Sequence, residues 1–320
     1  MRGDAAEPTA PATAAGSGVK VAAVQMTSTR DVQANLREAG RLVAEAARQG
    51  AKLVVLPENF SFLGATDADR VAAIEPFGDG PAQRFLAETA QRLDLWLVGG
   101  TIPIRDAGRD AGGRAMQARA GMPEVEQRRE QLPGAIADGG GERAASRSLL
   151  VGPDGRVAAH YDKIHLFDVD IPGKAAERYS ESATTVAGTR VVTATTPMAR
   201  IGMTVCYDIR FPALFHRLSV QGTDILVVPA AFTVPTGEVH WLPLLKARAI
   251  ESLVYVVAAG QCGEHAGGRK TYGHSLVLGP WGELLGELAT GPGVVCADID
   301  MIRLAELRQR FPTVQHRREL

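Results

Sequence analysis

Cys206 is the residue in this chain whose type and setting could support covalent catalysis. It follows the apolar run 201–205 and precedes YDIRFP, so its thiol would lie where a strand turns into a helix. Unpaired backbone N–H groups at such a turn can stabilise a thiolate or an oxyanion. Taken alone, the residue fits a nucleophile and a buried structural cysteine equally well.

Glu58 and Lys163 also stand directly after short apolar runs. Glu58 lies in LPENF, and Lys163 lies in YDKIHLFDVDIPG. A desolvated carboxylate has the raised pKa that a general base requires, and an ammonium group can hold an oxyanion. Each residue alone is more often a solvated side chain. Groups at separate strand ends converge on one pocket in α/β folds, so the three together predict one site with Cys206.

Other candidates for chemistry have weaker patterns. Cys262 and His265 have C-x-x-H spacing and His274 is near in sequence, but one thiol and scattered histidines do not predict a closed zinc site. His240 could serve as the base of a Cys-His dyad, although its helical context favours a packing role. The PGK at 172–174 lacks the glycine and hydroxyl residues of a phosphate loop. We therefore expect neither a metal nor a cofactor.

The elements that must position these residues alternate along the chain. Residues 1–18 are poor in apolar groups and predict a flexible tail. Strands are expected at 19–25, 53–56 and 95–104, and helices at 32–48 and 81–93, which indicates an α/β fold. Residues 106–145 interrupt the pattern as a mobile insertion with a weak helix at 123–132. A lid over the active site is the functional alternative for this insertion.

The rest of the chain predicts further strands and two helices, with a loop after residue 161. Two sheets packed face to face with helices outside accommodate so many strands better than one open sheet. The expected strands are 148–152, 157–161, 191–195, 200–205, 224–229, 254–259, 274–278 and 294–299, and the expected helices are 212–221 and 239–252.

Composition limits the partners and the setting. The 320 residues fit one large domain, which we place at 19–320. A formal charge of −1 and a pI near 6.7 give no field that attracts nucleic acid or a membrane surface, so a small molecule is the expected partner. The three cysteines are too few for a disulfide scaffold, and the N-terminus lacks a signal-peptide core. A cytoplasmic protein is expected.

Three separated motifs resemble one known family. LPENF, YDKIHLFD and GMTVCYDIRFP occur in the order found in the nitrilase superfamily of carbon-nitrogen hydrolases, and the similarity extends over residues 19–318. The resemblance implies a four-layer α-β-β-α sandwich that forms dimers through its outer helices. It also implies a catalytic triad of Glu58, Lys163 and Cys206 that needs no cofactor.

The resemblance implies further site residues. Similar enzymes carry a second glutamate after the lysine, and Glu181 in SES matches it best, with Glu177 as the weaker alternative. The backbone N–H of Tyr207 would share the oxyanion with Lys163.

Arg210 could pair with a substrate carboxylate, and an ion pair with Asp208 or another local acid is the equally open alternative. The carbamoylase branch of the superfamily has two adjacent arginines where this chain has Ile209 and Arg210. Ala213 stands where relatives usually carry a glutamate, which puts a supporting salt bridge near the nucleophile in doubt.

Within the superfamily, the C-terminal third is most similar to the deaminated glutathione amidases, for example in YGHSLVLGPWGE and FPTVQHRRE. This similarity implies hydrolysis of that substrate to 2-oxoglutarate and Cys-Gly through a cysteine thioester. An ω-amidase acting on 2-oxoglutaramate or a broader aliphatic amidase is the enzymatic alternative. A binding protein that has lost turnover is the alternative of another class.

Overall fold

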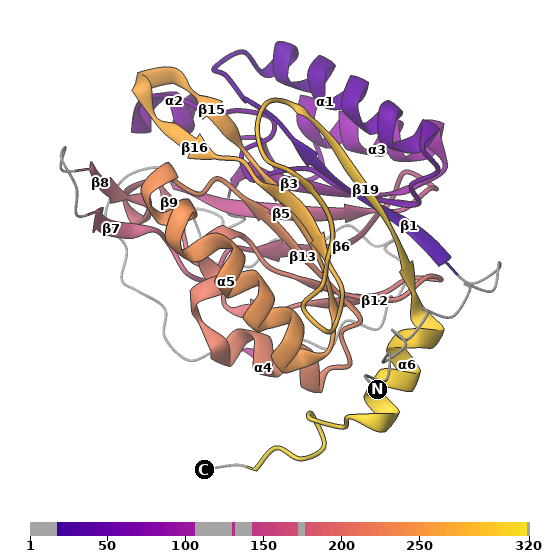
Figure 1. Cartoon of the computed structure of the whole chain (residues 1–320). Helices are drawn as coiled ribbons and strands as arrows, with labels where there is room; N and C mark the ends of the chain where they lie inside the picture. The colour runs from indigo at the N-terminus through magenta and orange to yellow at the C-terminus, as the bar shows by residue number, and fades with distance from the viewer. Residues whose placement is uncertain (1–17, 106–129, 132–142, 172–176, 319–320) are drawn as a thin grey trace, which may run out of the picture.

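Two β-sheets form the middle of the molecule (Figure 1). The computed structural model describes residues 18–105, 130–131, 143–171 and 177–318. The first sheet consists, in spatial order, of β19 (Gly293–Asp300), β1 (Gly18–Gln25), β2 (Leu53–Val55), β3 (Trp96–Arg105), β5 (Ala144–Val151) and β6 (Val157–Asp162), with β9 (Thr185–Val186) beside β5. The second consists of β11 (Thr193–Thr195), β12 (Arg200–Met203), β13 (Ile225–Ala230), β14 (Tyr255–Gly260), β17 (Ser275–Leu278) and β18 (Leu284–Leu288).

Helices cover the outer face of each sheet (Figure 1). Alternation along β1 shows the layering, because Ala22 and Val24 pack toward α1 (Val32–Arg48) and α3 (Pro81–Leu93). Val21 and Ala23 point the other way, into a core shared with the second sheet. The far face of the second sheet is covered by α4 (Pro212–Val220) and α5 (Val234–Ser252). The predicted four-layer α-β-β-α sandwich is confirmed.

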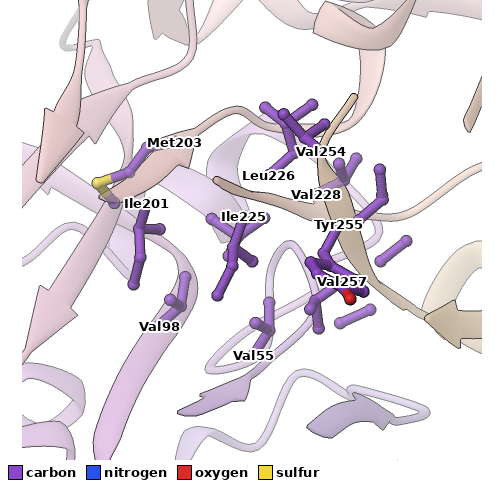
Figure 2. Packing of buried hydrophobic residues seen from close by; sticks show 14 of the residues in the cluster. Val55, Val98, Ile201, Met203, Ile225, Leu226, Val228, Val254, Tyr255 and Val257 are labelled. Atoms are coloured by element: carbon purple, nitrogen blue, oxygen red, sulfur yellow. The ribbon is translucent and has the colours of Figure 1, made fainter. Parts of the chain in front are cut away.

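Apolar side chains from both sheets fill the space between them. Figure 2 shows Val55 and Val98 of the first sheet opposite Ile201 and Ile225 of the second. All four are fully buried. Burying a side chain of this size stabilises the fold by about 1.5–3 kcal/mol, so the core that joins the sheets also holds the strand ends in register.

Helix α1 shows how local sequence defines an element. Asp31 caps it by accepting a hydrogen bond from the Ala34 N–H, and Leu36 and Val43 lie on its buried stripe. The chain leaves the helix at Gly50, whose φ of 90° favours glycine. The structure confirms the predicted helix 32–48.

Two elements differ from prediction in the second half of the chain. The helix expected at 239–252 begins already at Val234, because Gly237 lets its first turn pack closely against Tyr272, where a Cβ atom would lie 2.2 Å from the ring. The single strand expected at 191–195 is wrong. It is divided into β10 (Arg190–Val191), which pairs with β4 (Glu130–Gln131), and β11.

The predicted insertion 106–145 is only partly described. The predicted end of the insertion at residue 145 is wrong, because Ala144 and Ala145 are buried residues of β5. The helix expected at 123–132 is wrong at Glu130–Gln131, which is strand β4, and its remainder lies outside the described residues. The tail prediction, apart from Gly18 in β1, also lies outside them.

The structure has elements that the sequence pattern left as loops. They are α2 (Asp67–Ala72), α6 (Met301–Arg310), strands β9 and β18, the hairpin of β7 (Asp168–Ile171) and β8 (Glu177–Ser180), the hairpin of β15 (Cys262–Glu264) and β16 (Lys270–Tyr272), and the 3-10 turns η1 (Glu181–Ala183), η2 (Cys206–Arg210) and η3 (Ala266–Gly268). Across the described ranges, no helix is both long and apolar enough to span a membrane.

Candidate active site

The three residues singled out from the sequence meet at one edge of the sandwich. Glu58 follows β2, Lys163 follows β6 and Cys206 follows β12. Strand β6 is antiparallel to β5, which is antiparallel to β3, so β6 ends at the same edge as β2. All three side chains line one cavity of about 500 Å³ and are no more than 7% exposed.

Glu58 is positioned by two contacts to the backbone around it. Gly100 of β3 passes so close to Pro57 that a Cβ atom there would lie 1.8 Å from the Pro57 carbonyl oxygen. Only glycine permits this approach. From the other side, Gln261 Nε2 donates a hydrogen bond of 2.9 Å to the carbonyl of Glu58. The carboxylate is therefore presented from a rigid backbone.

Lys163 bridges two carboxylates. Its Nζ donates to Glu58 Oε1 at 2.8 Å and to Glu181 Oε2 at 2.7 Å. Burial by itself would lower the pKa of Lys163, but the charges of Glu181 and Glu58 outweigh it and raise the pKa above its ordinary value. Lys163 is thus a permanent cation. Glu177 lies in β8, and its side chain is outside the described part.

Cys206 is the first residue of η2, and its backbone is strained at the turn that follows β12. Its φ of 48° is left-handed, a conformation that costs a non-glycine residue free energy and is enriched at functional sites. Burial raises the pKa of the Cys206 thiol well above its ordinary value, and the hydrogen-bonded Glu58 carboxylate raises it further, while Lys163 lowers it in part. The resting sulfur therefore keeps its proton, and the Glu58 carboxylate is its hydrogen-bonded neighbour.

Asp208 holds this turn in place and was not singled out from the sequence. Its fully buried carboxylate accepts hydrogen bonds from the Val205 N–H at 2.9 Å, the Tyr161 hydroxyl at 2.7 Å and the His165 N–H at 3.1 Å. The His165 ring stacks on Phe211. The sequence did contain a signal for this role. A carboxylate two residues after a candidate nucleophile predicts a side chain that holds the turn, because a short acidic side chain can accept hydrogen bonds from nearby backbone N–H groups.

Tyr207 and Arg210 lie in the wall of the same cavity. The Tyr207 ring packs edge-on against Phe167, with 5.1 Å between the ring centroids. Arg210 contacts His240 of α5, with 3.1 Å between Nη1 and Nδ1. The alternative of an ion pair between Arg210 and Asp208 is wrong, because Asp208 is engaged with other partners and Arg210 makes no ion pair with any residue that the structure describes.

Ala213, where a supporting glutamate was expected, is exposed on the first turn of α4. The turn after Cys206 receives support from α5 instead. Arg248, only 5% exposed, donates from Nε to the Ile209 carbonyl at 2.9 Å and lies over the Phe215 ring. The missing salt bridge therefore does not leave this turn unsupported.

The residues weighed for a zinc site make separate contacts. His265 bonds Thr271 Oγ1 through Nε2 at 2.6 Å, and His274 Nδ1 lies 2.7 Å from Glu287 Oε1. Cys262 is buried in β15. No group of three metal-binding side chains gathers within the described ranges.

Comparison with known proteins agrees with this geometry. The family model described as carbon-nitrogen hydrolase matches residues 20–309. A deaminated glutathione amidase from Synechocystis sp. is 39% identical over 298 residues, which is 92% of this chain and 97% of the relative. Omega-amidase NIT2 of Homo sapiens is 34% identical over 300 residues, covering 93% of this chain and 95% of the relative.

Solved structures are similar as well. The C. elegans NitFhit protein matches with a TM-score of 0.75 and 32% identity, over 95% of this chain and 66% of that one. An amidase mutant from Nesterenkonia sp. AN1, with the acetamide moiety of fluoroacetamide added covalently at its active site cysteine, matches with a TM-score of 0.68 and 25% identity, over 97% of both chains. Motifs, fold and relatives agree, and this chain belongs to the carbon-nitrogen hydrolase family, whose members hydrolyse carbon-nitrogen bonds other than peptide bonds.

Proposed function

We propose that this protein is an amidase that hydrolyses deaminated glutathione to 2-oxoglutarate and Cys-Gly, with Cys206 as the nucleophile. The observation that carries the proposal is the meeting of a thiol, a carboxylate and an ammonium group in one cavity, from strand ends far apart in the sequence. Residues 19–320 act as one hydrolase domain.

The first half of the reaction forms a thioester. Glu58 takes the thiol proton as the sulfur of Cys206 attacks the amide carbon. The carbonyl oxygen becomes an oxyanion, which the Lys163 ammonium and the Tyr207 N–H stabilise. A donor of this kind typically contributes roughly 3–4 kcal/mol to the transition state. Glu58 then passes its proton to the nitrogen, the carbon-nitrogen bond breaks, and the amine leaves.

The second half releases the acid. Glu58, again a carboxylate, takes a proton from a water molecule that attacks the thioester carbon. The tetrahedral intermediate collapses, and the proton on Glu58 returns to the sulfur of Cys206. Glu181 helps to position the water through its contact with Lys163 at 2.7 Å. The reaction consumes one water molecule and uses only groups of the chain.

The substrate assignment rests on the relatives and on charge. Several curated relatives carry the name deaminated glutathione amidase, including the one from Synechocystis sp.. Arg210 lines the cavity and is free of acidic partners among the described residues, so we assign it to a substrate carboxylate. The similarity to omega-amidase NIT2 supports 2-oxoglutaramate as the second candidate substrate.

Steady-state rates on deaminated glutathione, 2-oxoglutaramate and a simple aliphatic amide test the assignment. We expect the highest kcat/KM on deaminated glutathione. If either of the other two amides gave a higher value, that amide would replace deaminated glutathione as the assigned substrate. Cys206→Ala should abolish turnover, whereas Cys262→Ala, at a cysteine in β15, should retain it. Intact-mass spectra should show an acyl adduct that requires Cys206. Ligand binding without any turnover would favour the non-catalytic binding protein.

For assembly and setting, we propose a homodimer formed through the outer helices, acting in the cytoplasm as a metabolite-repair enzyme. Val220 of α4 and Val239 and Ile250 of α5 support this interface, because these apolar side chains are 61%, 63% and 46% exposed. Solvent-exposed apolar groups on neighbouring helices favour association. Light scattering should give a dimer mass that Val239→Glu reduces, and a monomeric wild-type protein would contradict the proposal.

A further inference from the structure

Two arginines that line the cavity have hydrogen-bonding groups that no described residue satisfies. Arg70 comes from α2, and Arg269 directly follows η3. Within the described ranges, Nε and Nη2 of Arg70 and Nε of Arg269 are buried without a hydrogen-bond partner. The remaining contact of Arg70 is long, 3.4 Å from Nη1 to Asn59 Oδ1. Neither guanidinium group makes an ion pair with a described residue.

The charges around the two arginines favour an added anion. Burial lowers the pKa of Arg70, Glu181 and Glu58 act against this, and Arg269 lowers the pKa further as a nearby like charge. Both glutamates already accept hydrogen bonds from Lys163. Two adjacent cations with unused buried donors repel each other unless an anion lies between them.

Arg269 is connected to the reacting sulfur through one residue, Ala231. Arg269 Nη2 donates a hydrogen bond of 2.9 Å to the Ala231 carbonyl. The backbone N–H of Ala231 is hydrogen-bonded to the sulfur of Cys206. The Tyr179 ring lies 5.3 Å from the Arg269 guanidinium and restricts its plane. A group bound at this pair would therefore be part of a molecule whose amide reaches Cys206.

We propose that Arg70 and Arg269 form an anion subsite that binds a carboxylate of the substrate away from the amide being cleaved. Guanidinium groups bind carboxylates through paired, charge-assisted hydrogen bonds, which matches the unused donors on both side chains. The subsite selects amides that carry such a carboxylate over neutral amides of equal size. This inference rests on the proposed amidase function for its choice of substrates.

Kinetics with matched substrate pairs test the subsite. In the first pair, glutaramate carries a carboxylate on the acyl part, and 5-methylhexanamide carries a neutral group of similar shape at the same position. In the second pair, N-butanoylglycine carries the carboxylate on the amine part, and N-isobutylbutanamide is its neutral match. In Arg70→Met and Arg269→Met, kcat/KM for a charged substrate should fall about 10- to 100-fold, mainly through KM, the size expected for charge-assisted bonds. The neutral partner should change by less than about 3-fold. The pair that responds identifies which carboxylate is bound.

The control is Arg84→Met, on the exposed face of α3 where Arg84 pairs with Asp79. It should leave both members of each pair unchanged. Equal losses on charged and neutral substrates in the Arg70 and Arg269 variants would mean that these arginines only support the fold, and would overturn the proposal. Charged substrates that are unaffected in both pairs would overturn it as well.

A binding measurement separates this proposal from the proposed function. In Cys206→Ala protein, calorimetry with 2-oxoglutarate, for an acyl-side carboxylate, and with N-butanoylglycine, for an amine-side carboxylate, should show that the Kd of at least one ligand rises about 10-fold or more when Arg70→Met or Arg269→Met is added. Absence of amide turnover in the wild type would reject the amidase function but leave this readout intact. A Kd that is unchanged for both ligands would overturn the subsite whatever the activity of the enzyme.

Discussion

Lys163 and Glu58 are 105 residues apart in the sequence, and their side chains meet at 2.8 Å inside the protein. The same ammonium contacts Glu181 at 2.7 Å, so one cation serves two carboxylates. Such an arrangement keeps Glu58 close to Cys206 while restricting its rotation. The pair is therefore part of the fold as well as of the chemistry.

Removing the shared cation should destabilise the protein strongly. Lys163→Met leaves the buried Glu58 and the partly buried Glu181 without their ammonium partner, and we expect the free energy of unfolding to fall by about 3–5 kcal/mol. Urea denaturation measures this loss. Lys52→Met removes the exposed ion pair with Asp94 and serves as the control, with an expected change below about 1 kcal/mol. Similar losses in both variants would show that the buried network contributes nothing special.

Lowering the pH should remove the contribution that ionised Glu181 makes to the stability of the fold. Burial by itself would raise the pKa of Glu181, but Lys163 and Arg70 outweigh it and hold the pKa below its ordinary value of 4.5. A depressed folded-state pKa contributes stability that is complete above the unfolded-state pKa and is lost as the pH falls through the folded-state value.

The difference in unfolding free energy between wild type and Glu181→Gln should thus be constant from about pH 6 to 8 and shrink below about pH 4. Urea titrations across this range measure it. Glu88→Gln, at an exposed position of α3, is the comparison variant. A difference that grows on acidification would refute the assigned direction.

Asp208 should matter for catalysis through the position of Cys206. Asp208→Asn places an amide NH₂ among groups that donate hydrogen bonds, so we expect a loss of about 2–3 kcal/mol in stability. The kcat should fall with KM little changed. Tyr161→Phe removes one hydrogen-bond donor to the Asp208 carboxylate and should lower the stability by only about 1 kcal/mol. A kcat equal to wild type in folded Asp208→Asn would exclude the positioning role.

Gly100 should not tolerate a side chain. A Cβ atom there would overlap the Pro57 carbonyl, and backbone cannot move aside as a flexible side chain can. Gly100→Ala should destabilise the protein by about 3 kcal/mol or more and displace Glu58. Thermal unfolding and kcat report the two effects. Gly18→Ala, in β1 with ordinary spacing, should change stability by less than about 1 kcal/mol.

Several elements that the sequence analysis did not predict have local sequence signals that could have identified them. Thr66 and Asp69 form a capping box at the start of α2, a pattern that can be recognised by its spacing. The DVDI of β7 alternates polar and apolar residues as a half-exposed strand does. The first turn of α5 also had a start signal, because Thr233 stands at its N-cap position and Pro235 lies in its first turn. Its close packing against the distant Tyr272 at Gly237 had no local signal.

The sequence by itself determined which groups could do chemistry and in what order they occur. Cys206, Glu58 and Lys163 stand after apolar runs that form strands, and strand formation depends on local alternation and burial. Only the tertiary structure decided that Lys163 is shared between two glutamates and that Arg70 and Arg269 line the same cavity. These contacts join distant parts of the chain, and their distances depend on how sheets and loops pack, which short-range sequence patterns do not encode.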